Sequence, residues 1–173
     1  MLESTRELTA YHEAGHAVAV LMRGGGQLHS IDIGETADYR GYTHFSAKVF
    51  DTAFITFAGP FAEARALWPL DDLDGEDENG KTFDDYVRDA FNANAVGDFE
   101  AYPAALNADP TTLASFQSRR EETWKQELKR EWHVIEVVAR RLLTIGADMY
   151  HGPDHRTWHD TIQQLLGVHA DGE

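Results

Sequence analysis

The stretch YHEAGHAVAV, residues 11–20, places two histidines four residues apart among small and apolar residues, and it constrains the fold more than any other segment. Ser4 or Thr5 can cap a helix before it, and three glycines at 24–26 can end that helix after Met22. Residues i and i+4 lie on the same face of a helix. The segment therefore predicts a mostly buried helix that carries two imidazole rings on one face.

The residue types at these positions match the requirements of a catalytic zinc ion. His12 and His16 can direct one ring nitrogen each at an ion about 2.0 to 2.1 Å away. Glu13 follows His12 directly, so its carboxylate can reach a water beside the ion without being a ligand. Zinc lowers the pKa of water towards about 7, and a nearby carboxylate can then take the proton. The pattern predicts hydrolysis with Glu13 as general base.

An ordinary core helix is the alternative, with histidines that are hydrogen-bonded to backbone carbonyls or to acids. The neighbours of the motif from Ala17 to Val20 are small or apolar. Burying two imidazoles and a carboxylate in such surroundings is costly unless a partner compensates for the lost water. The setting therefore favours the metal site.

A catalytic zinc site takes a third protein ligand and leaves one position for water. The chain has no cysteine, so this ligand must be His, Asp or Glu. Position 22 is Met and the next histidine is His29, so no third histidine follows at the spacing of the extended motif. Several acids on later predicted helices stay open as the third ligand: Glu63, Asp98, Glu100, Glu121 and Glu122.

The remainder of the 173 residues predicts a mainly helical fold with a small antiparallel β-sheet, built as one domain over residues 1–173. Alternating or aromatic-rich segments predict two strands, and apolar periodicity predicts the helices. Gly59-Pro60 should interrupt one helix and divide it into two pieces. The strands are expected at 28–34 and 39–45, and the helices at 46–68, about 82–96, from Asp109-Pro110 to Gly146, and 154–166.

The charge distribution limits the partners. Thirty acidic and fifteen basic residues give a net charge of −15, which argues against nucleic acid and anionic lipid. Six acids lie within residues 71–78, so 69–81 is predicted to be a flexible acidic loop. No segment has the length of apolar sequence that a membrane span requires, and the first ten residues lack the pattern of a signal peptide. A cytoplasmic protein without membrane insertion is expected.

Several segments, in order, resemble the peptidase domain of FtsH-type proteases. AYHEAGHAVAV is similar to the zinc helix of that family, and IDIG with RGYTHF is similar to its strand pair. FAGPFAEARA resembles a later family helix, although Gly59-Pro60 replaces Gly-Arg and Ala64 replaces a second glutamate. VGDFEAY resembles the element whose aspartate is the third zinc ligand, with Gly97 in place of an asparagine. The resemblance covers about residues 8–102 and assigns that role to Asp98.

The resemblance implies a zincin-like metallopeptidase that binds Zn²⁺ through His12, His16 and Asp98 and hydrolyses peptide bonds of a peptide or an unfolded protein. No phosphate-binding GxxxxGK[ST] loop is present, so the domain is expected to stand free of the family's ATPase module. A separate ATPase or adaptor partner and an oligomer stay open. The alternative function is a zinc-stabilised binding or adaptor domain without catalysis, and a metal-free helical interaction protein is a third.

Three further expectations concern residues outside the motif. Glu63 can accept a hydrogen bond from the far ring nitrogen of His12 or His16 and so orient that ring, or it can itself be the third ligand. Tyr42 and Thr43 lie on the strand expected beside the metal, where an extended peptide can add as a further strand. His155 and His159 are again four apart, but no glutamate follows either of them, so they are assigned to a surface helix.

Overall fold

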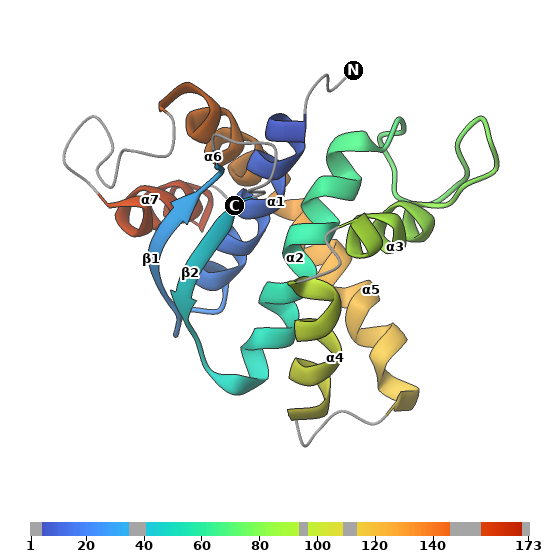
Figure 1. The fold of residues 1–173 in the computed structure, drawn as a ribbon, viewed down its shortest axis with the longest axis horizontal. Coiled ribbons are helices and arrows are strands. Elements are labelled where there is room, and N and C mark those ends of the chain that lie inside the picture. The colour runs from blue at the N-terminus through green and yellow to red at the C-terminus, as the bar shows by residue number, and fades with distance from the viewer. Residues whose placement is uncertain (1–4, 35–40, 94–96, 109–113, 146–156, 171–173) are drawn as a thin grey trace.

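Two long helices, α1 (Thr5–Met22) and α2 (Val49–Leu67), lie side by side at the centre of the fold (Figure 1). The computed structural model describes residues 5–34, 41–93, 97–108, 114–145 and 157–170. Every residue of α1 from Thr9 to Val20 is buried, as the sequence predicts. The two helices approach closely at Gly15, where a Cβ atom would lie 2.3 Å from the carbonyl oxygen of Ala58.

The sheet is a two-stranded antiparallel ribbon of β1 (Gln27–Asp32) and β2 (Tyr42–Ser46), which confirms the small sheet predicted. Leu28 pairs with Phe45, but Ser30 pairs with His44, so His29 is an extra residue in β1. Such a bulge resets the alternation of side chains along the strand. The sequence did not predict it, because period-two patterning assumes an uninterrupted strand.

Helix α2 runs continuously through Gly59 and Pro60, so the predicted division into two helical pieces is wrong. Proline removes one backbone N–H and normally destabilises a helix interior. Here nearly all residues from Ala53 to Ala64 are buried. Burial of apolar surface on both sides of the proline offsets the missing hydrogen bond.

The remaining helices surround this centre (Figure 1). The predicted long helix is wrong in one respect: it is two helices, which meet at Glu131. The break lets the ring of Trp132 stack on Tyr11 of α1, with centroids 5.6 Å apart. The helices are α3 (Phe83–Ala93), α4 (Asp98–Ala108), α5 (Ala114–Arg130), α6 (Trp132–Ile145) and α7 (Trp158–Ala170).

Some of the predicted helix ends lie within the described residues, and others lie outside them. Within the described part, the last helix begins at Trp158. Helix α4 continues through Pro103, so this proline does not end the helix that begins at Asp98. The fold is thus mainly helical with one small sheet. The predicted positions that belong to undescribed segments are the Asp109-Pro110 cap, Gly146, Asp154 and His155.

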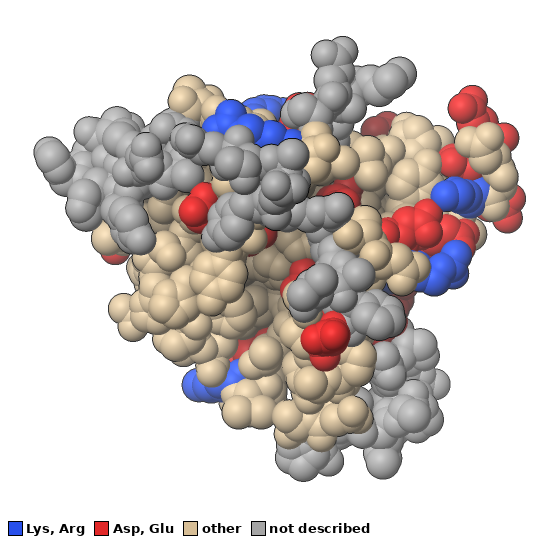
Figure 2. Space-filling view, viewed as in Figure 1, with Lys and Arg blue, Asp and Glu red and all other residues tan. Residues whose placement is uncertain are grey.

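The acidic segment 69–81 contains a hydrogen-bonded turn around Asp77. Its carboxylate accepts hydrogen bonds from the backbone N–H groups of Asn79 and Lys81, each 2.8 Å long, and from the hydroxyl of Tyr86. Acidic side chains gather at this side of the molecule, over α3 and the preceding loop (Figure 2). The flexibility of the segment stays a prediction. No helix in the described part of the chain combines the length and apolar character needed to span a membrane.

Candidate metal centre

Helices α1 and α4 bring together the three residues that were predicted to bind zinc. His12 and His16 lie one turn apart on α1, and Asp98 is the first residue of α4. The Oδ2 atom of Asp98 lies 2.7 Å from Nε2 of His12 and 3.3 Å from Nε2 of His16. The two Nε2 atoms are 3.1 Å apart. Residues 86 positions apart in the chain therefore converge on one point.

Two of these three separations are close to those between ligands of one metal ion, and the third, 2.7 Å, is the length of a hydrogen bond. Tetrahedral ligands at 2.0 to 2.1 Å from zinc lie about 3.3 Å from one another. One ligand atom from each of the three residues lies within 4.8 Å of the others, and both histidines are buried. The His12, His16 and Asp98 group can hold a metal ion.

The far nitrogen of each imidazole makes a hydrogen bond that points Nε2 at this site. Nδ1 of His12 lies 3.0 Å from Oε2 of Glu63, and Nδ1 of His16 lies 2.8 Å from the carbonyl oxygen of Ile55. Acceptors at Nδ1 fix the proton there and leave the Nε2 lone pair for a metal. Glu63 thus contacts Nδ1 of His12, whereas Asp98 contacts Nε2 of the same ring. From this position Glu63 can orient the ring, and it is Asp98 that lies where a third ligand would.

Gly59 of α2 lies against the Nε2 atoms of both histidines. A Cβ atom at this position would lie 2.3 Å from Nε2 of His16 and 2.8 Å from Nε2 of His12. Any side chain would therefore occupy the space at the two ligand nitrogens. The sequence indicates Gly59 only as part of a helix interruption, because no periodic signal shows which ring a glycine faces.

Glu13 lies on the same buried helix, and its carboxylate accepts a hydrogen bond from the sheet. Its side chain is nearly inaccessible, and its Oε2 atom accepts a hydrogen bond of 2.6 Å from the hydroxyl of Thr43 on β2. On the other side, a Cβ atom at Gly41 would lie 2.9 Å from Oε1. The sequence predicts Thr43 on a strand beside the metal, but it does not predict this contact with Glu13.

Burial and charge shift the pKa values of the cluster. Burial alone lowers the pKa of His12, but hydrogen bonds to Asp98 and Glu63 outweigh it and raise the pKa to about 10. Burial also lowers the pKa of His16, but the charge of Asp98 and the hydrogen bond to it raise this pKa by more, so the net shift is upward. Burial tends to raise the pKa of Asp98, but the charges of His16 and His12 hold it well below its usual range. Burial raises the pKa of Glu13.

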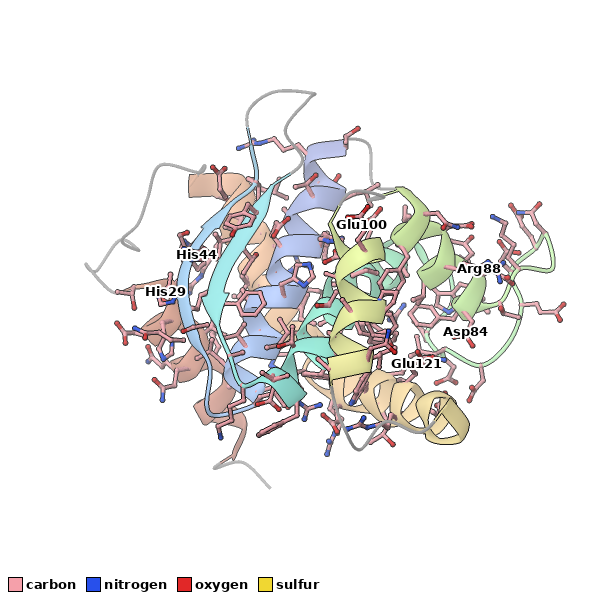
Figure 3. All side chains as sticks on the ribbon, turned by 60° about the horizontal axis from the view of Figure 1, so that its bottom comes forward. His29, His44, Asp84, Arg88, Glu100 and Glu121 are labelled. Atoms are coloured by element: carbon pink, nitrogen blue, oxygen red, sulfur yellow. The ribbon has the colours of Figure 1, made fainter. Side chains whose placement is uncertain are left out.

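The other acids considered as ligands lie outside the group. Glu100 is exposed in the first turn of α4 (Figure 3). Glu121, on α5, accepts a hydrogen bond of 2.6 Å from the hydroxyl of Tyr102. Glu122 lies 3.4 Å from the ammonium group of Lys125. Of the candidate acids left open by the sequence, the structure brings Asp98 to both Nε2 atoms.

Comparisons of the chain with protein-family models, with curated proteins and with solved structures give no match. The chemistry of the site therefore carries the functional argument.

Proposed function

We propose that the protein is a zinc-dependent metallopeptidase with a zincin-like active site, related to the FtsH-type peptidases that its motifs resemble. The observation that carries the proposal is the position of Glu13. A buried carboxylate that interacts electrostatically with the three candidate metal ligands, and that accepts a hydrogen bond from Thr43, supports the role of general base.

The donor set supports zinc as the ion. Two imidazole nitrogens and one carboxylate oxygen form a common catalytic zinc set, which leaves one coordination position open. Three carboxylates, those of Glu13, Glu63 and Asp98, lie at or beside the cluster. A divalent cation offsets two of these three negative charges when the carboxylates are ionised and the histidines are neutral. When bound, zinc supplies Lewis-acid polarisation of a carbonyl group and lowers the pKa of water.

The residues of the chain would share the remaining tasks. His12, His16 and Asp98 hold the ion, and Glu63 keeps His12 oriented. Glu13 accepts the proton of the attacking water and transfers it to the departing amine. Its raised pKa favours the first of these steps, because a carboxylate with a higher pKa accepts a proton more readily than an ordinary glutamate does.

The ribbon offers a place for an extended substrate. In the described part of the chain, β1 contacts β2 on one side and helix α7 lies against it, whereas β2 pairs with β1 alone. A peptide can add through main-chain hydrogen bonds to the edge of β2 that faces away from β1, which pairs with no other strand of the described residues. We propose that the substrate is an unfolded protein or a peptide. We also propose that a separate ATPase or adaptor delivers this substrate.

Zinc analysis and casein hydrolysis test the proposed function together. The wild-type protein, purified with added zinc, should hold one equivalent per chain and should cut casein. Glu13→Gln should keep the zinc and lose hydrolysis, and Asp98→Ala should lose bound zinc. Less than about half an equivalent in the wild type would contradict the site. Full zinc content without hydrolysis would instead favour a zinc-stabilised binding domain.

A further inference from the structure

We propose that Thr43 is a positioning residue for Glu13, so that strand β2 sets the orientation of the general base. The inference rests on the proposed function for its catalytic consequence, whereas its structural part concerns two residues of this chain alone.

The contact between the two side chains is short and buried. Thr43 is 7% exposed and Glu13 is 5% exposed. The hydroxyl of Thr43 lies 2.6 Å from Oε2 of Glu13 and 3.2 Å from its backbone oxygen. A threonine hydroxyl has one proton to donate. The shorter distance assigns that proton to the carboxylate, as expected for a charge-assisted hydrogen bond.

The strand explains why this side chain faces the helix. Thr43 pairs with Ile31 of β1, and its neighbours Tyr42 and His44 are both exposed. Successive side chains of a strand point to opposite faces, so Thr43 must point inward when its neighbours point outward. Figure 3 labels His44, one of these two exposed neighbours. The contact with Glu13 therefore depends on the register of the strand pair.

The space around Oε1, the second carboxylate oxygen of Glu13, is also limited. Gly41 has a φ of 112°, which favours glycine, and a Cβ atom there would lie 2.9 Å from Oε1 of Glu13. Thr43 contacts one carboxylate oxygen, and the backbone at Gly41 limits the space beside the other. Glu13 thus has one preferred orientation, and the donor that selects it comes from β2.

Loss of the hydroxyl should leave the fold intact and release the carboxylate. Valine has nearly the shape of threonine but cannot donate, so Thr43→Val removes the hydrogen bond without opening a cavity. A buried carboxylate without its donor would turn towards another partner. A displacement of about 1 Å at a reacting group costs on the order of 100-fold in rate.

Two variants and one matched control test the inference. Thr43→Val should lower kcat on a fluorogenic peptide about 10- to 100-fold, with KM and zinc content unchanged. Thr43→Ser restores the donor and should keep kcat within about threefold of wild type. Thr9→Val is the control, because it removes a hydroxyl that bonds to the Thr5 carbonyl of the same helix and does not bond to Glu13.

Crystal structures of the same variants give a readout that does not need activity. The carboxylate of Glu13 should be displaced in Thr43→Val and should stay in place in Thr43→Ser. A wild-type rate in Thr43→Val, or an unmoved carboxylate, would overturn the positioning role. Absence of hydrolysis in the wild type would contradict the proposed function instead, and the position of Glu13 would still decide the role of Thr43.

Discussion

Gly59 lies directly against the ring of His16, where a Cβ atom would be 2.3 Å from Nε2. Gly59→Ala should therefore abolish zinc binding although it alters no ligand, because the new methyl group and the ring cannot share this space. Zinc content after dialysis measures the effect. Gly97→Ala is the matched control, since a Cβ atom at Gly97 meets nothing within 4 Å. Retention of a full equivalent of zinc in Gly59→Ala would show that the ion lies elsewhere.

The bond between Glu63 and His12 predicts a graded effect on zinc affinity. Glu63→Gln keeps an acceptor but loses the charge, and Glu63→Ala loses both. Changes to a group that orients a metal ligand typically weaken affinity about 10- to 100-fold. We expect Glu63→Ala to reach that range and Glu63→Gln to fall short of it in competition titrations with a chelating dye. Exposed Glu100 supplies the control, and a loss of affinity in Glu100→Gln equal to that of Glu63→Ala would contradict the assignment.

Removal of the metal should lower the thermal stability. An ion that binds only the folded chain adds about 4 kcal/mol when its free concentration is a thousand times its Kd. For a chain of 173 residues this corresponds to a decrease in Tm of roughly 8 to 16 °C on chelation. Calorimetry with and without chelator checks it, and Asp98→Ala should show no chelator effect. An unchanged wild-type Tm would favour a metal-free helical protein.

Zinc binding should release protons at neutral pH. Because the pKa of His12 is about 10 in the metal-free protein, its imidazole is protonated at pH 7 and must lose a proton before Nε2 can bind an ion. The apparent zinc affinity should rise as the pH rises from 6 to 9. Titration calorimetry in buffers of different ionisation enthalpy counts the protons. Release of none at pH 7 would contradict the raised pKa.

The metal-free protein should lose stability as the pH rises. The pKa of His12 is raised from 6.5 to about 10, so its contribution to the free energy of unfolding is complete below 6.5 and disappears as the pH approaches 10. The lowered pKa of Asp98 acts at the acid end, where its contribution is lost as the pH falls below its ordinary value. Chemical denaturation of the metal-free protein across this range measures the slope. His12→Gln should flatten the slope between 6.5 and 10.

The sequence by itself determined the buried helix that carries both histidines and the residue types available to hold a metal ion. Spacing of four residues places His12 and His16 on one face, because the helical period is fixed by backbone geometry. The absence of cysteine restricted the ligands to His, Asp and Glu. Apolar flanks predicted burial, and residues 9–20 are buried. These are local properties, and local properties can be read from a sequence.

The tertiary structure decided everything that depends on residues distant in the chain. The convergence of Asp98 on His12 across 86 positions, and the different contacts that Asp98 and Glu63 make with His12, follow from how α2 packs on α1 and α4 packs on α2. The bulge at His29 and the break at Glu131 have no periodic signature, since periodic patterning assumes an uninterrupted strand or helix. The bond from Thr43 to Glu13 depends on strand register, which only the assembled fold establishes.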